Sequence, residues 1–354
     1  MGPDGPHLLE RNPVIRVRPM ASDDRARWDA FVAACPEATF FHRAGWREVL
    51  ERAFGHRTHY LLAERGGDIV GVLPLTEIRS RLFGHALISN AFCVYGGIAT
   101  TEEAARAALD SEARKLARAL QVGYLEYRNL RPRHLDWPTQ DLYCTFRKPL
   151  EPDVEANLKA IPRKQRAMVR KGMKNGLKAE FDADVDRFYA LFADNVHRHG
   201  TPVLPRRYFV LLKEVFGADC DVLTVTHQGR AVSSVLTFWF RDEVLPYYAG
   251  DVPAARELAA NDFKYWELMR HACERGCRVF DYGRSKRGTG QFDFKKNWGF
   301  TPQPLYYEYD LVRLSHIPQH NPANPKYRLF IALWKRLPRA VVNTLGPHLV
   351  KSLG

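Results

Sequence analysis

Apolar and polar residues alternate along the first part of the chain with the period of a helix and then with the period of a strand. Residues 22–35 place their large apolar side chains on one helical face, which predicts a first helix, and a second is expected at about 43–53. Residues 56–80 read as two apolar strands joined at Gly66 and Gly67. This is the pattern of a β-hairpin.

A longer helix and another strand follow the hairpin. Thr100 and Glu103 have the spacing of a capping box, which predicts the start of a helix that continues to about residue 120. Residues 122–128, VGYLEYR, then read as a strand.

The same order of elements returns in the second part of the chain. Residues 123–128, GYLEYR, match residues 278–283, RVFDYG, 155 positions later. Five earlier positions have counterparts 162 residues later: Trp46 and Tyr208, Phe54 and Phe216, Gly55 and Gly217, Gly67 and Gly229, and Val70 and Val232. A series matched at near-constant spacing predicts two copies of one α/β domain.

The repeat predicts how the chain is divided. We expect a first α/β domain at residues 13–150, a second at 151–312 that begins with a basic helix, and a basic amphipathic tail at 313–354. Mixed sheets flanked by helices are expected in both domains. With 45% hydrophobic residues, the 354-residue chain can fill two cores.

Positive charge is concentrated in two segments. The net charge is +13, yet residues 156–179 hold eight Lys or Arg and no acid, and residues 311–354 hold seven and no acid. The rest of the chain is slightly acidic. The charge therefore indicates two local anion-binding surfaces rather than a uniformly basic protein.

Cysteine spacing and hydropathy indicate a cytoplasmic protein. The six cysteines show no CxxC pair, so they are expected to be reduced and mostly buried. Neither Cys273 and Cys277 near His271, nor His197 with His199, has the further ligands of a metal site, and none is predicted. No apolar run is long enough for a signal or spanning segment.

Residues 279–300 combine a strand, a glycine loop, cations and aromatics. The stretch VFDYG reads as a short buried strand, and Gly283 can take a positive φ after it. Arg284 and Lys286 follow, and we expect them to position an anionic part of a substrate. The alternative is a solvated basic hairpin without a ligand.

The basic segment between the two copies is predicted to be helical. Six cations, Arg166 and Arg170 among them, lie on successive turns and repel one another unless an anion neutralises them. We therefore expect a surface for phosphate, in a nucleotide-linked precursor, RNA or lipid head groups. A solubilising linker helix is the alternative.

The tail alternates apolar clusters with Lys and Arg and is broken by Pro338. Residues 325–354 can pack on the body of the protein or lie peripherally on an anionic membrane at its inner face. Both outcomes are expected to bury Leu329, Phe330, Leu333 and Trp334.

The order helix, hairpin, helix, strand in duplicate resembles tandem acyltransferase-like domains of the GNAT kind. Acetyl-CoA enzymes of that fold hold the pyrophosphate on a [QR]xxGx[GA] loop between a central strand and the next helix. Residues 90–103 and 245–262 stand at these two places and lack the pattern. This indicates another acyl donor or no catalysis.

The chain resembles the FemABX family of aminoacyl-tRNA-dependent peptidyltransferases. It is more similar still to FemAB-related proteins of bacterial PEP-CTERM and exopolysaccharide systems. The resemblance rests on motifs in order over residues 13–312: FFHRAGW, YGG, RKQRAMVRKGMKNG, HGTPVLPRRYF, PYYAG, FDYGRS and FDFKKNWG.

The resemblance implies roles for four residues. Phe294 and Lys295 match a Phe-Lys pair implicated in the family's transfer step, where an ammonium can stabilise an oxyanion. Tyr208 and Tyr248 match tyrosines near the family's precursor site, and core aromatics are the alternative for both. Leu204 stands where the resemblance leads us to expect a precursor-binding Arg, which puts the usual UDP-linked precursor in doubt.

Three functions stay open. The first is an acyl or aminoacyl transferase that modifies an amine of an envelope or glycan precursor, with aminoacyl-tRNA as donor and no tightly bound cofactor. The second is an acyl-CoA-dependent N-acetyltransferase. The third is a non-catalytic module that holds RNA or anionic lipid. No DNA partner is predicted.

Overall fold

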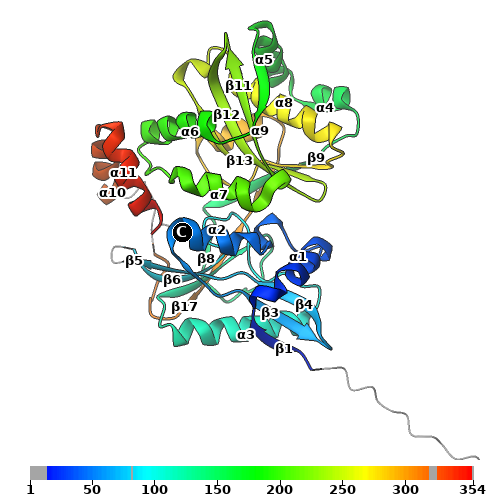
Figure 1. Cartoon of the computed structure of the whole chain (residues 1–354), viewed down its shortest axis with the longest axis vertical. Coiled ribbons are helices and arrows are strands. Elements are labelled where there is room, and N and C mark those ends of the chain that lie inside the picture. Colours follow the sequence, from blue (N-terminus) through cyan, green and yellow to red (C-terminus); the bar gives the residue numbers. More distant parts are fainter. Residues whose placement is uncertain (1–13, 81–82, 319–324, 353–354) are drawn as a thin grey trace, which may run out of the picture.

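Residues 14–80, 83–318 and 325–352 are described by a computed structural model, and over these ranges the chain forms three β-sheets with flanking helices. Two α/β halves are stacked along the long axis (Figure 1). A sheet of strands β1-β3-β4 and one of strands β2-β5-β6-β7-β17-β8 form one half. The other contains a sheet in the order β10-β11-β12-β13-β14-β9-β15, with β16 beside β9.

The first half follows the predicted order of elements. Both early helices and the helix near residue 101 are confirmed, with residues 22–24 forming a short 3-10 turn before α1. The elements are β1 (Arg16–Pro19), α1 (Arg25–Ala34), α2 (Gly45–Phe54), β2 (Arg57–Thr58), β3 (Leu61–Arg65), β4 (Asp68–Leu73), β5 (Thr76–Ser80), β6 (Gly84–Ser89), α3 (Glu103–Ala119), β7 (Tyr124–Asn129), β8 (Thr139–Gln140) and β9 (Tyr143–Pro149).

The predicted capping box at the start of α3 is wrong. The helix is preceded by Glu102 and has no side-chain cap. Thr100 Oγ1 instead donates to the carbonyl oxygen of Val70 at 2.6 Å and accepts from the N–H of Glu102. Thr100 therefore joins the loop to strand β4, a tertiary contact that the local spacing does not reveal.

The second half repeats the order after two additional helices. Its elements are α4 (Val154–Ala160), α5 (Arg163–Lys174), β10 (Lys178–Asp182), α6 (Asp186–His199), α7 (Arg206–Phe216), β11 (Cys220–His227), β12 (Arg230–Phe240), β13 (Glu243–Asp251), α8 (Ala260–Glu274), β14 (Val279–Asp281), β15 (Ser285–Lys286), α9 (Gly290–Asn297), β16 (Pro302–Pro304), β17 (Tyr306–Leu311), α10 (Pro325–Trp334) and α11 (Arg339–Val350). The strand predicted at 279–283 is confirmed and is shorter, ending at Asp281. The alternative of a basic hairpin is wrong, because α9 follows the glycine loop.

The two halves exchange one strand each. Strand β17 pairs with β7 of the first half, and β9 pairs with β14 of the second. Strand β9 ends at Pro149 and strand β17 ends at Leu311. These two positions are 162 residues apart, which is the spacing of the repeat, so the exchanged strands correspond to each other. The predicted boundary at residue 150 thus falls just after a strand that belongs to the second sheet.

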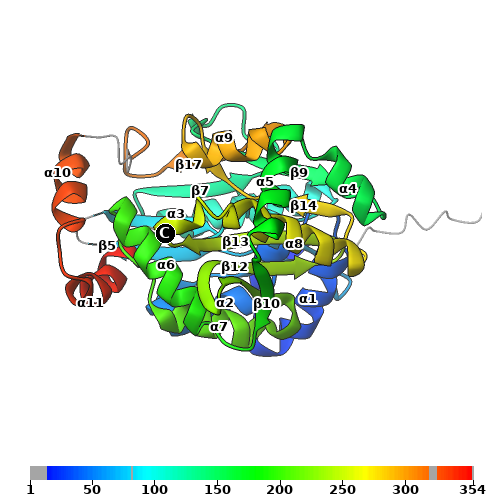
Figure 2. The same cartoon turned by 90° about the horizontal axis from the view of Figure 1, so that it is seen from above.

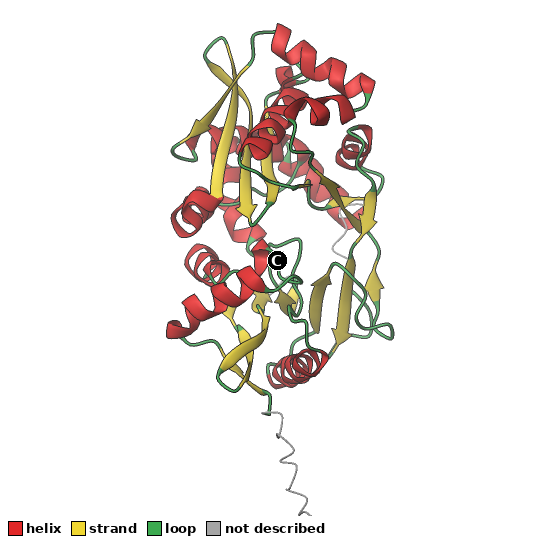
Figure 3. Cartoon of the chain, turned by 90° about the vertical axis from the view of Figure 1, so that its right-hand side faces the viewer, coloured by secondary structure: helices red, strands yellow, loops and turns green. Residues whose placement is uncertain are grey.

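Helices α2 and α7 pack against each other where the halves meet (Figure 1). In the side view, helices separate the sheets of the two halves at this interface (Figure 3). The contacts are reciprocal. The ring centroids of Trp46 and Phe216 are 5.3 Å apart, and those of Phe54 and Tyr208 are 5.2 Å apart. In the repeat, Trp46 corresponds to Tyr208 and Phe54 to Phe216, so each residue contacts the counterpart of the other. This exchange of contacts is what an approximate two-fold rotation between the halves produces.

The tail forms two helices that Pro338 separates, as predicted. The body of the protein buries only part of the tail's apolar set. Trp334 is 3% exposed, but Phe330 and Leu333 are 39% and 55% exposed; the Leu329 side chain lies outside the described residues. All six cysteines are free and buried, as predicted. No described helix is long and apolar enough to cross a bilayer.

Candidate functional site

Strands β13 and β14 separate near the junction of the halves. They pair in parallel only at Glu243 with Val279 and at Val244 with Phe280. Farther along β13, Tyr247 and Tyr248 are only partly buried, although β13 lies inside the sheet. Beyond these two pairs β13 and β14 are not paired with each other. We call this unpaired stretch the opening, and the phenol rings of Tyr247 and Tyr248 lie on its β13 side.

A loop of the first half, residues 90–97, enters this opening; we call it the junction loop. Tyr247 donates its hydroxyl to the carbonyl oxygen of Phe92 at 2.9 Å. Tyr307 of the exchanged strand β17 donates to the carbonyl oxygen of Val94 at 2.8 Å. Both halves therefore build the opening.

The structure brings Tyr208 and Tyr248 together. Their hydroxyl oxygens are 3.1 Å apart, across α7 and β13. Tyr208 is 0% exposed, and burial raises its pKa well above the ordinary value. Tyr248 is partly exposed and is the member of the pair that a ligand can touch.

Arg284 also lies at this opening. Its guanidinium donates to Tyr307 Oη at 3.1 Å and lies 4.5 Å from the centre of the Tyr143 ring. Among the described residues it contacts no carboxylate. Its charge is therefore not neutralised by an acid and can bind an anion. Lys286, on β15, is half-buried.

Lys295 is buried behind the strand, on helix α9. Its ammonium donates to the carbonyl oxygens of Tyr282, Gly283 and Arg284, at 2.7, 3.0 and 3.2 Å. An ammonium has three N–H groups, so these contacts use all of them. Burial lowers the pKa of Lys295 to about 7, against the opposing field of Asp281.

Phe294 precedes Lys295 and is half-buried in an aromatic cluster. Its ring lies 5.7 Å from that of Tyr265 and 6.0 Å from that of Trp298. Phe294 and Lys295, the pair predicted to act in the transfer step, thus hold helix α9 against the backbone of residues 282–284. An oxyanion contact from Lys295 requires that it release one of the three carbonyls.

A buried polar network joins the halves at Asp281. Tyr95 of the junction loop donates to Asp281 Oδ2 at 2.9 Å, and the N–H of Gly283 donates to Oδ1 at 2.7 Å. Arg147 Nε lies 3.7 Å from the same carboxylate and also pairs with Glu243. Burial raises the pKa of Asp281, and Arg147 opposes this shift.

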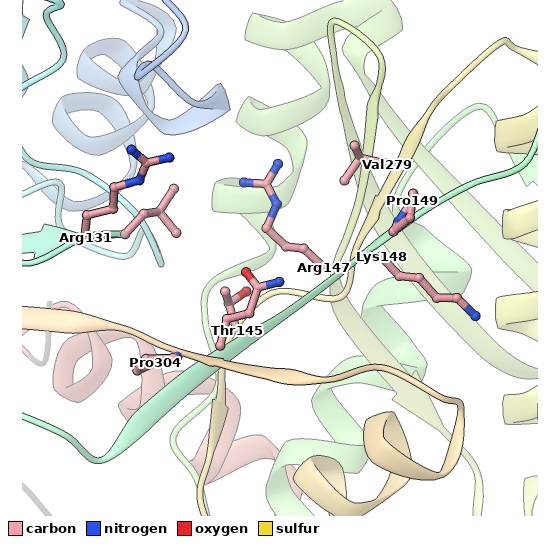
Figure 4. Close-up of a pocket in the computed structure, with 9 residues that line it drawn as sticks. Arg131, Thr145, Arg147, Lys148, Pro149, Val279 and Pro304 are labelled. Carbon is pink, nitrogen blue, oxygen red and sulfur yellow. The ribbon is translucent and has the colours of Figure 1, made fainter.

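A cavity of about 380 Å³ lies beside this network. It is lined by Leu130, Arg131, Thr145, Arg147, Lys148, Pro149, Val279, Gln303 and Pro304. Figure 4 shows the guanidinium groups of Arg131 and Arg147 on one side of β9, with Lys148 extending away from them. Arg131 is exposed, and in the described part of the chain it has no ion-pair partner.

A second cavity of about 440 Å³ shares Leu130, Arg131 and Arg147 with the first. It continues over the junction loop at Gly96 and reaches Arg241, and its lining holds two acids, Glu37 and Glu243, against four arginines. We call the two together the cationic cleft. Since arginines form paired hydrogen bonds with carboxylates and phosphates, this cleft suits an anionic group.

Helix α5 is the second cationic surface. Of its 12 residues, RKQRAMVRKGMK, six are Lys or Arg and none is acidic. Arg166 donates to the carbonyl oxygen of Lys159, and Arg170 is exposed. No ion pair links an α5 cation to an acid among the residues that the structure describes. Most other arginines in helices do have such partners.

Helix α5 packs against the start of α8. A Cβ added to Gly172 would lie 2.7 Å from Phe263 Cβ, and Asn175 Nδ2 donates to the carbonyl oxygen of Leu258 at 3.1 Å. The strand-to-helix turn before α8 is the place where acetyl-CoA enzymes of this fold bind pyrophosphate. Here a basic helix lies against it.

Sequence reasoning identified the stretch 279–300 but assigned no role to Arg131, Arg147 or Tyr95. Arg147 could have been identified from the sequence, because two adjacent cations, Arg147 and Lys148, are unusual inside a strand. Arg131 lies in a loop with no motif. In the described ranges, no cluster of three or more His, Cys, Asp or Glu side chains could hold a metal ion.

Comparison with known proteins agrees with the predicted fold. Residues 163–296 match the model of an acetyltransferase (GNAT) domain. The structure of FemX is similar with a TM-score of 0.64 and 15% identity, covering 83% of this chain and 97% of that one. No match occurs among proteins of curated function.

Two further solved structures share the architecture. The C-terminal domain assigned to a lysylphosphatidylglycerol synthetase of Agrobacterium fabrum has a TM-score of 0.57 and 14% identity, covering 81% of this chain and 92% of that one. A tandem GNAT protein from the clavulanic acid biosynthesis pathway has a TM-score of 0.52 and 14% identity, covering 84% and 98%. At these identities the likeness concerns the fold, and the prediction of tandem GNAT-like domains is confirmed.

Proposed function

We propose that this chain is an aminoacyltransferase that moves an aminoacyl group from tRNA to an amine of a bacterial cell-envelope or exopolysaccharide-related precursor. The observation that carries the proposal is helix α5, whose six cations lack acidic partners among the described residues. A surface of that kind binds a phosphate backbone. The GNAT match and the FemX-like fold support acyl transfer as the reaction class.

The packing of α5 favours a donor other than acetyl-CoA. The turn before α8 is covered by Gly172 and Asn175, and the loops at 90–103 and 245–262 lack the pyrophosphate pattern. Lys148 extends the positive surface beyond α5, since a Cβ on Gly299 would lie 3.9 Å from its Nζ and 3.3 Å from Pro162, next to the start of α5. In this proposal a bound RNA follows α5 as far as Lys148, on the side of β9 away from Arg131 and Arg147 (Figure 4).

The acceptor occupies the cationic cleft in this proposal. Arg131 and Arg147 hold its anionic group, and the rest of the acceptor extends toward Tyr248 and Arg284. The amine nitrogen attacks the ester carbonyl carbon, a C–N bond forms, and the C–O ester bond breaks. The amine loses one proton and the departing ribose hydroxyl gains one. Lys295 contributes by holding residues 282–284, and Arg284 with them, in place.

The experiment compares donors. Purified protein is incubated with an envelope extract and either labelled aminoacyl-tRNA or labelled acetyl-CoA. We expect label to pass only from the tRNA and the transfer to fall in an Arg170→Glu/Lys174→Glu variant. A matched Arg57→Glu/Arg230→Glu variant has the same net charge change at exposed strand ends and is expected to transfer normally. Transfer from acetyl-CoA alone would reject the proposed donor.

An acyl-CoA-dependent N-acetyltransferase is the second candidate, because the matched domain model is that of an acetyltransferase. Calorimetric titration with acetyl-CoA separates the two. Saturable binding supports the second candidate, and no heat of binding supports the first.

A further inference from the structure

Helices α10 and α11 attach to the body through one face (Figure 2). Trp334, Val342 and Val350 are 3%, 1% and 9% exposed. A Cβ on Gly346 would lie 2.9 Å from the backbone nitrogen of Val203, and one on Gly200 would lie 2.6 Å from Ile331 Cγ2. The two helices are therefore closely packed on the second half and hold a fixed orientation.

The same two helices carry exposed apolar side chains. Phe330, Leu333, Val341 and Leu345 are 39%, 55%, 37% and 47% exposed, and the Phe330 ring stacks on that of the buried Trp334. Large apolar side chains that stay exposed on neighbouring helices usually mark an interaction site. We call these four residues the tail surface.

Exposed cations flank the tail surface. Lys335, Arg336 and Lys351 are exposed, and none forms an ion pair within the described part of the chain. Residues 311–354 contain no acid at all. Strand β5, which carries the 69% exposed Arg79, lies on the same side of the molecule (Figures 1 and 2).

We propose that the tail surface inserts into the interface of an anionic lipid membrane. Apolar side chains that project from short helices and are flanked by Lys and Arg match the composition of interfacial membrane anchors. Each cation near an anionic leaflet adds a favourable electrostatic contribution. The cations that flank the tail surface also disfavour a second copy of the chain, because they would repel each other across a shared face.

This surface is separate from the cationic cleft and from α5, so the inference does not depend on the proposed reaction. It explains the exposed apolar side chains, which neither the fold nor the cleft uses. It also gives the chain a fixed orientation at a membrane.

The test uses the full chain and sedimenting vesicles of phosphatidylcholine alone or with phosphatidylglycerol. We expect binding only to the vesicles with phosphatidylglycerol and weaker binding at high salt. A Leu333→Glu/Leu345→Glu variant should bind about tenfold less or worse. Because both side chains are exposed, its thermal unfolding temperature should match that of the unchanged protein.

Two controls keep the inference open to refutation. The Arg170→Glu/Lys174→Glu variant of α5 should bind vesicles normally, and a loss there instead of in the tail would overturn the assignment. Light scattering of the unchanged protein should give a monomer. A dimer that the Leu333→Glu/Leu345→Glu change dissociates would identify a second copy as the occupant and reject the membrane. Failure to bind any phosphatidylglycerol vesicle would reject it too.

Discussion

Arg52 and Glu214 occupy equivalent positions in the two halves, 162 residues apart, and form an ion pair of 2.9 Å with each other. The approximate two-fold axis that relates α2 to α7 therefore passes close to this pair. Along the same interface, Trp46 meets Phe216 and Phe54 meets Tyr208. The crossed order of contacts shows that the halves face each other through the same surface of each repeat.

The ion pair itself should contribute little to stability. The two side chains are 39% and 52% exposed, and exposed pairs contribute about 0–1 kcal/mol. We expect Arg52→Ala and Glu214→Ala each to lower the free energy of unfolding by less than about 1 kcal/mol, whereas Trp46→Ala should cost about 3–5 kcal/mol because it leaves a cavity. Urea unfolding measures all three. A large coupling in the Arg52/Glu214 double mutant would contradict this ranking.

His42 should make the protein less stable in mild acid. It is 1% exposed, its Nδ1 accepts from the Thr39 N–H, and its Nε2 faces the carbonyl oxygen of Gly97 at 3.2 Å. Burial lowers its pKa from 6.5 to about 4, so between these values the unfolded chain binds more protons. Stability is then lost as the pH falls below 6.5.

The measurement compares the unchanged protein with a His42→Gln variant. Between pH 7 and pH 5 the unchanged protein should lose about 2 kcal/mol more than the variant. The comparison cancels the contributions of other groups, such as His134, whose pKa is raised to about 9. Parallel pH profiles for the two proteins would show that His42 titrates normally.

Replacement of Arg131 and of Arg147 should both weaken anion binding, but only the second should lower the stability of the fold. Arg131 is exposed and lacks an ion-pair partner in the described ranges, so Arg131→Met should change the free energy of unfolding by about 0.5 kcal/mol or less. Arg147→Met leaves Glu243 and Asp281 without their cation and should cost about 2–4 kcal/mol.

Both changes should weaken binding of pyrophosphate, used as a probe anion, by about tenfold. Calorimetry measures the affinity and urea unfolding the stability. If Arg131→Met left pyrophosphate affinity unchanged, the cationic cleft would lose its role in anion binding.

Lys295 should act through the backbone that it holds. Replacement by Met leaves the carbonyls of Tyr282, Gly283 and Arg284 without their donor and should cost about 2–4 kcal/mol. Because these carbonyls position Arg284, Lys295→Met should weaken acceptor binding about as much as Arg284→Met does. Steady-state kinetics with aminoacyl-tRNA separate the alternatives. A fall in kcat with unchanged acceptor affinity would instead favour a direct oxyanion contact.

Helices and strands could be predicted because the hydrophobic pattern that indicates each of them lies within its own residues. The second helix was expected at about 43–53, where α2 forms, and the 162-residue spacing predicted the duplication and with it the counterpart of α2, helix α7. The exchange of β9 and β17 was not predictable, since an antiparallel strand carries no local mark of the partner that it pairs with.

The sequence predicted only part of the candidate site, because several of its contacts join residues that are distant in the chain. From the resemblance, Tyr208 and Tyr248 were each expected near the precursor site, and the structure places their hydroxyls 3.1 Å apart. The three carbonyls around Lys295 could not be anticipated, because they belong to a loop 11 to 13 residues earlier in the chain. The exposure of Leu333 likewise depends on which face of α10 the body covers.

The reciprocal placement of β9 and β17 has a consequence for synthesis. When residue 150 leaves the ribosome, the sheet of the first half still lacks the edge partner of β7, which arrives only with residues 306–311. The nascent first half must therefore wait with β7 uncovered on one side, where chaperones or a neighbouring nascent chain can reach it. Completion of the first domain thus depends on translation of nearly the whole second one.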